Sequence, residues 1–153
     1  MKHIKKMLLA IIVVFIAIQF IQPEHNKSSQ LLPSDITKNC SVPDSVVDIL
    51  KTACFDCHSD NTRYPWYADI QPVAWLMSYH IRTGKENLNF SEFGAYSHRK
   101  QVNKLRAIDS SVNSGSMPLW SYNLIHTNAR LSYREQILII NWARKTKDSL
   151  TQN

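Results

Sequence analysis

The stretch TACFDCHSD, residues 52–60, contains two of the three cysteines of this 153-residue chain and decides how the rest is interpreted. Cys54 and Cys57 are separated by two residues, and His58 follows the second cysteine directly. A Cys-x-x-Cys-His motif can hold a metal ion, a disulfide or a covalently attached group, and each needs different surroundings. The pattern of helices and strands around the motif therefore helps to distinguish them.

Two of these interpretations are disfavoured. A thioredoxin-like dithiol places its Cys-x-x-Cys at the start of a helix that follows a strand, where the helix dipole lowers the thiol pKa. Here a helical pattern precedes the motif and no strand pattern precedes it. A structural zinc site needs four ligands, usually including a second Cys or His pair at similar spacing. The third cysteine, Cys40, stands alone, and we expect a buried thiol there rather than a cross-link to a second chain.

The third interpretation, covalent haem c, is favoured. Two thiols at this spacing can add to the two vinyl groups of haem, and the next residue can then ligate the iron. The sequence therefore predicts one haem c, attached through Cys54 and Cys57, with His58 as the proximal iron ligand.

The sixth iron ligand has more than one candidate. Met117 lies in NSGSMPLW, residues 113–120, and is followed by a proline that would stiffen the loop. Thioether ligation favours ferrous iron and suits an electron carrier. Met117 is therefore the favoured distal ligand, His80 is the principal alternative, and His126 is a further one.

Aromatic side chains cluster after the motif and could line a haem pocket. Among them we single out Tyr67 and Trp75 as possible pocket residues, and Arg63 and Arg82 as further candidates to contact the propionates. Aromatic clusters more often belong to a core. The two roles are compatible, because the porphyrin would itself lie at the centre of a small domain.

The N-terminus carries an apolar run, MLLAIIVVFIAIQFI, at residues 7–21, after three lysines. At about 1.5 Å per helical residue it spans about 22 Å, less than the roughly 30 Å of a bilayer core. No small-x-small cleavage site follows it. We expect residues 1–21 to be an uncleaved membrane anchor; a cleaved signal peptide is the alternative.

Both interpretations of the N-terminal segment, anchor and signal peptide, imply that the rest of the chain is exported. The lysines should stay cytoplasmic, which puts the remaining chain on the periplasmic side of the inner membrane, or free in the periplasm after cleavage. Residues 22–40 lack periodicity and are rich in Pro, Ser, Asn and Gln, which is typical of a linker. Residues 41–153 are then the haem-binding domain.

Helical patterns dominate this domain. Residues 42–54 lead into the motif, and residues 71–84 begin beside a proline and end at Gly84, a common residue after a helix. Capping-box spacing occurs in NFSE, residues 89–92, and in SYRE, residues 132–135, which opens the strongest helical pattern. The predicted class is all-α. The position of Met117 just before the final helices resembles class I cytochromes c, which implies their packing: the helix before Cys54 crosses the C-terminal helix, and one haem is held between the motif and the Met117 loop.

The charge distribution argues against nucleic acid as a partner. The formal net charge is +6, but three of the basic residues precede the apolar run. From residue 22 onward fifteen basic and twelve acidic residues remain, without a basic stripe.

The chain also resembles a known family. CFDCHSDNTRYPWYADIQPVAWLMSYHIRTGKENLNFSEF, GSMPLW and HTNARLSYREQILIINWA are similar to the small bacterial haem-binding domain family of envelope-anchored c-type cytochromes. The similarity covers residues 35–147. It implies covalent haem at Cys54 and Cys57, His58 as proximal ligand and an N-terminal membrane anchor, and it leaves Met117 and His80 both open as distal ligand.

The expected function is electron transfer with redox partner proteins of the envelope. We expect an electron carrier rather than an enzyme. A haem peroxidase, or a ligand sensor whose distal ligand is displaced, is the alternative.

Overall fold

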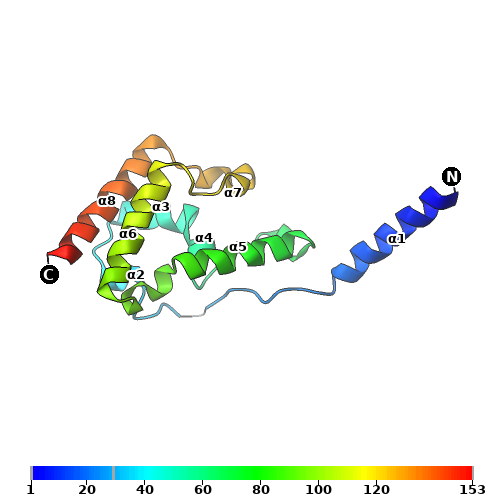
Figure 1. The fold of residues 1–153 in the computed structure, drawn as a ribbon, viewed down its shortest axis with the longest axis horizontal. Coiled ribbons are helices and arrows are strands. Elements are labelled where there is room, and N and C mark those ends of the chain that lie inside the picture. The colour runs from blue at the N-terminus through cyan, green and yellow to red at the C-terminus, as the bar shows by residue number, and fades with distance from the viewer. Residues whose placement is uncertain (1, 29, 153) are drawn as a thin grey trace.

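The computed structural model describes residues 2–28 and 30–152. Apart from one isolated β-bridge between Lys27 and Asn61, the secondary structure of these residues is helical, so the predicted all-α class is confirmed (Figure 1). The elements in chain order are α1 (Lys2–Ile18), α2 (Ile36–Asn39), α3 (Asp44–Ala53), α4 (Phe55–His58), η1 (Trp66–Asp69), α5 (Val73–Asn87), η2 (Phe90–Ala95), α6 (His98–Asn113), α7 (Trp120–Ile125), η3 (Thr127–Ala129) and α8 (Tyr133–Thr151).

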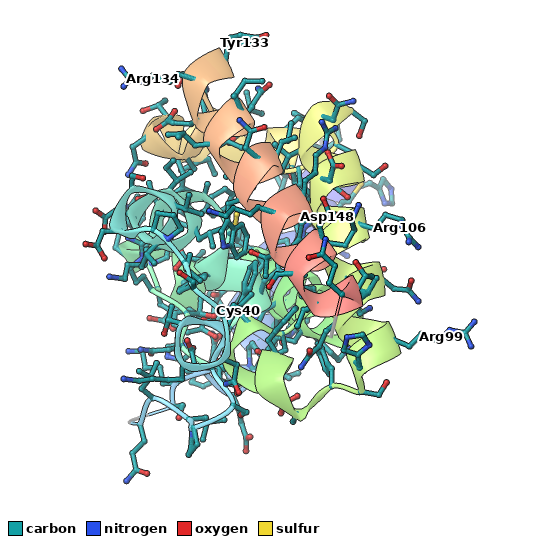
Figure 2. The ribbon with its side chains drawn as sticks, turned by 90° about the vertical axis from the view of Figure 1, so that its left-hand side faces the viewer. Cys40, Arg99, Arg106, Tyr133, Arg134 and Asp148 are labelled. Carbon is teal, nitrogen blue, oxygen red and sulfur yellow. The ribbon has the colours of Figure 1, made fainter. Side chains whose placement is uncertain are left out.

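The core lies mainly where α6 and α8 pack along one another. Buried positions of α6 recur every three or four residues, which places them on one face: Val102, Leu105, Ile108 and Val112. On the solvent side of the same helix, the side chains of Arg99 and Arg106 project outward (Figure 2). Burial of these apolar faces, at about 25 cal/mol per Å², is the main term that holds the two helices together.

The helix that leads into the motif contacts the C-terminal helix, as expected. α3 lies against α8, and the indole of Trp142 in α8 donates to the carbonyl of Ser41 at 3.2 Å. The predicted capping box is confirmed: the hydroxyl of Ser132 accepts from the amide of Glu135, whose carboxylate accepts from the amide of Ser132.

Residues 22–40, predicted to be a linker, differ from that prediction because part of this segment belongs to the fold. Ile36 is 0% exposed and joins the core, and Asp35 caps α2 by accepting from the amide of Thr37. Cys40 ends α2 and packs against the edge of the core, where burial raises the pKa of its thiol (Figure 2). Although this segment lacks a helical period, its residue Ile36 is part of the core.

The segment directly after α1 is fastened to the start of α5. Gln71 is completely buried; its amide donates to the side chain of Gln19, and its side chain donates to the carbonyl of Ile21. α1 itself extends away from the domain, and none of its residues is buried along its described length (Figure 1). Among the described residues, no helix has the length and apolar character needed to span a bilayer.

Candidate functional site

Cys54, Cys57 and His58 occupy a single helical turn. Cys54 is the N-cap residue of α4, and its carbonyl accepts from the amides of Cys57 and His58 at 3.2 and 3.0 Å. In the described part of the chain the cysteines are unpaired. Two free thiols and an imidazole therefore come from the same turn, which is the arrangement that the haem interpretation needs.

The imidazole of His58 is held by the end of α5. Its Nδ1 lies 2.9 Å from the carbonyl oxygen of Leu88, the C-cap residue of that helix. A carbonyl only accepts, so Nδ1 carries the proton and donates it to this contact. Burial lowers the pKa of His58, against the opposing effect of the Leu88 and Gly84 carbonyls. The ring is therefore neutral at pH 7, with the Nε2 lone pair left for a metal ion.

α5 comes very close to the motif at Gly84. A Cβ atom at this position would lie 2.4 Å from the carbonyl oxygen of Cys57. The prediction that the helix ends at Gly84 is wrong, because α5 continues to Asn87. The glycine serves a different purpose: the absence of a side chain lets the helix contact the backbone of the motif.

The residues after the motif are fastened to the start of η2. The carboxylate of Asp60 accepts from Asn89 Nδ2 at 2.9 Å and pairs with Lys85 Nζ at 2.7 Å. The amide of Asp60 donates to the hydroxyl of Ser91 at 3.1 Å. The side chain of Asn89 also caps η2, so the cap predicted at NFSE exists but begins a 3₁₀ helix.

A buried carboxylate within the motif connects it to two other segments. Asp56 receives two hydrogen bonds from the guanidinium of Arg63, at 3.0 and 3.1 Å, and one from the hydroxyl of Tyr122 at 2.7 Å. Burial, and then the bond to Asp56, raise the pKa of Tyr122 above its ordinary range. Neither Asp56 nor Tyr122 was predicted for the site; the available signal was an acidic residue between two cysteines.

The thiols of the motif are not poised as reactive thiolates. Burial, followed by the neighbouring Cys57, raises the pKa of Cys54 to about 12. Burial, followed by the charge of Asp56, raises the pKa of Cys57 to about 11. A dithiol oxidoreductase requires the opposite shift, because the thiolate is the reacting species. The neutral thiols thus argue further against the thioredoxin-like interpretation.

Tyr67 and His126 lie together, beside the motif. The hydroxyl of Tyr67 is 2.7 Å from Nε2 of His126, and the ring of His126 stacks on Tyr122 at 4.2 Å. Burial lowers the pKa of His126. A pocket of about 230 Å³ opens here, lined by Thr52, Asp56, Arg63, Tyr64, Pro65, Tyr122, His126 and Asn128.

The α5 residues predicted for the site fall on different sides of the helix. His80 precedes Gly84 by four residues and so lies on the face that contacts the motif. Trp75 precedes Gly84 by nine residues, two and a half turns of about 3.6 residues each, and so lies on the opposite face. Its indole donates to the carbonyl of Ile21. The structure therefore brings His80, but not Trp75, to the side of the motif.

Met117 lies in the loop between α6 and α7 and is 36% exposed. Its amide donates to the carbonyl of Ser111 at the end of α6. Five residues later, Tyr122 bonds to Asp56, which connects the segment carrying Met117 to the motif. Beside this loop the side-chain oxygen of Asn123 is buried without a hydrogen-bond partner among the described residues.

Comparison with known proteins identifies one family. A family model described as a haem-binding domain matches residues 13–145. Comparisons with curated proteins and with solved structures gave no match.

Proposed function

The chain belongs to the haem-binding domain family, and we propose that it is a monohaem c-type cytochrome domain that transfers electrons in the bacterial cell envelope. In this proposal Cys54 and Cys57 hold haem c by thioether bonds, and His58 is the proximal ligand of its iron. The observation that carries the proposal is the His58 ring, held through Nδ1 with Nε2 available, on the same turn as two unpaired thiols.

The residues around the motif suit a large apolar group. Exposed apolar side chains lie on α7 and the loop before it, the segment that Tyr122 ties to the motif: Met117, Trp120, Leu124 and Ile125. When bound, haem would supply one-electron exchange at its iron. The contribution of the chain is to hold the imidazole at Leu88 and to present the two thiols.

Met117 is proposed as the distal ligand. It is an accessible thioether on the loop that precedes Tyr122, and thioether ligation would suit an electron carrier. His80 is the alternative, supported by its place on the Gly84 face of α5. One variant at each of these two positions distinguishes the two candidate ligands.

We place the domain on the periplasmic side of the inner membrane, attached through α1, with redox proteins of the envelope as partners. Lys2, Lys5 and Lys6 precede an apolar run whose side chains are exposed along the helix. An apolar helix with no buried residue along its described length would be stabilised by insertion into lipid.

The proposed ligands are tested by optical spectra of the oxidised protein and of Met117→Ala and His80→Ala. We expect a near-infrared sulfur-to-iron band that disappears in Met117→Ala and persists in His80→Ala. A wild-type protein without this band, whose spectrum changes only in His80→Ala, would contradict methionine ligation.

Carbon monoxide distinguishes the carrier from the peroxidase or sensor. An iron with two firm protein ligands should bind little carbon monoxide when reduced. Ready uptake by the native wild-type protein would contradict the carrier and favour a displaceable distal ligand.

A further inference from the structure

The end of α1 is fixed against one particular face of the domain. Gln19 and Ile21 bond to Gln71, and the side chain of Gln22 donates to the carbonyl of Asp69 at 2.9 Å. The indole of Trp75 donates to the carbonyl of Ile21 at 3.1 Å. The few residues that follow α1 are therefore held against the start of α5, and α1 extends from that end of α5 (Figure 1).

The outer face of α5 at this end carries exposed aromatic residues. Trp75 is 40% exposed and Tyr79, one turn later on the same face, is 56% exposed. The guanidinium of Arg82 lies 5.9 Å from the centre of the Tyr79 ring. Exposed apolar residues flank this stripe where α1 ends: Phe20, Ile21 and Ile70.

We propose that Trp75 and Tyr79, with Arg82, form a surface that rests in the headgroup region of a lipid bilayer. Tryptophan and tyrosine combine an apolar ring with a polar tip, and they concentrate at the membrane–water interface for that reason. Arginine adds a cation for lipid phosphates. This inference rests on the proposed attachment of α1 to the membrane.

Continuity with α1 is what favours lipid over a protein partner. The apolar helix ends three residues before Ile21, whose carbonyl is bonded to Trp75. Whatever layer receives α1 must therefore lie next to Trp75. A lipid bilayer offers an apolar interior to α1 and, next to it, a headgroup layer with both apolar and polar groups to Trp75, Tyr79 and Arg82.

The surface would also orient the haem motif. Trp75 lies on the side of α5 opposite to Gly84, and Gly84 contacts the backbone of Cys57. Trp75 and the motif therefore lie on opposite sides of α5. The motif then faces the aqueous side, where soluble redox partners can reach it.

The test measures the surroundings of a nitroxide label at residue 79. The full chain carries Cys40→Ser with Tyr79→Cys, and a matched protein carries Cys40→Ser with Tyr133→Cys. Tyr133 is also exposed and lies at the start of α8 (Figure 2), and Figure 1 shows α8 and α1 at opposite ends of the molecule. A Cys40→Ser protein without an added cysteine measures background labelling.

The labelled proteins are mixed with vesicles of phosphatidylethanolamine and phosphatidylglycerol, and flotation separates the bound fraction. We expect oxygen to collide more often, and a water-soluble nickel chelate several-fold less often, with the label at 79 on vesicles. The label at 133 should not change. Flotation without that change at 79 would overturn the lipid surface alone, whereas failure to float would overturn membrane attachment and the surface together.

Discussion

At the scale of single residues, position 84 leaves no room for a side chain beside the motif. An added Cβ would meet the carbonyl oxygen of Cys57 at 2.4 Å and its carbonyl carbon at 3.1 Å. These are backbone atoms, so they can yield only if α4 or α5 moves. Because His58 and the thiols share α4, such a movement would disturb the whole motif.

Gly84→Ala should therefore destabilise the protein. Alanine gains about 1 kcal/mol over glycine in a helix interior, but overpacking against backbone costs about 1–3 kcal/mol. We expect a net loss in the free energy of unfolding by urea, together with a smaller yield of haem-loaded protein.

Gly94→Ala is the matched control. A Cβ there would meet the side chain of Asn39 rather than backbone. Turning this side chain away breaks its hydrogen bonds to the carbonyls of Pro33 and Asp35 but leaves the backbone in place. A smaller loss is expected. Equal or greater destabilisation by Gly94→Ala would contradict the importance assigned to close backbone approach at Gly84.

At the scale of single residues, the sequence allowed side chains to be proposed as haem ligands, but not the backbone groups that hold them in place. The thiols, the imidazole and the Met117 thioether are side chains of types that ligate or attach haem, so a sequence motif can point to them, and their roles stay predictions. The acceptor for His58 is the carbonyl of Leu88, and a backbone group has no signature in the sequence. Gly84 was interpreted as a helix stop because glycine commonly follows a helix end, and only the fold shows which backbone approaches it.

At the scale of elements, α8 depends on a defined N-terminus. The hydroxyl of Ser132 satisfies the amide of Glu135, and the carboxylate of Glu135 satisfies the amide of Ser132. Helix starts leave amides without intrahelical acceptors, so this box fixes where α8 begins.

Ser132→Ala should lower the free energy of unfolding by about 1 kcal/mol, the usual effect of losing an N-cap. Ser149→Ala, at an exposed position in the same helix, is the control and should be nearly neutral or slightly stabilising. A thermal or urea melt at pH 7 measures both.

The cap should weaken in acid. Bonds from the Ser132 hydroxyl, then from its amide, lower the pKa of Glu135 below its ordinary value. A lowered pKa means that this contribution is present above the unfolded-state pKa and is lost as pH falls through the folded-state pKa. The difference between wild type and Ser132→Ala should therefore shrink below about pH 4. A difference that grows in acid would contradict this role.

The elements were predicted unevenly, for physical reasons. α3 and α8 have strong apolar periods and recognisable starts, and both were expected. α6 was not, although Val102, Leu105, Ile108 and Val112 follow a helical period, because charged residues surround them. Ile36 is a lone apolar residue in a polar segment, and its burial depends on tertiary packing that local patterns do not contain.

At the scale of the whole molecule, the motif lies at the edge of the core, against which Cys54 and Phe55 pack. α6 and α8 build most of the core, while the motif is held by α5, η2 and α7. The proposed lipid surface lies on the far side of α5 from the motif. Substitutions in the motif should therefore remove the haem while leaving the packing of α6 on α8 intact.

Covalent attachment of haem is the central claim and is tested directly by acid–acetone extraction. The protein is produced in cells that mature c-type cytochromes, extracted, and assayed as the pyridine haemochrome. We predict that haem stays with the wild-type polypeptide and with Cys40→Ala, and that Cys54→Ala/Cys57→Ala retains none. A wild-type protein that loses its haem to the acetone, or that is purified colourless, would contradict the account.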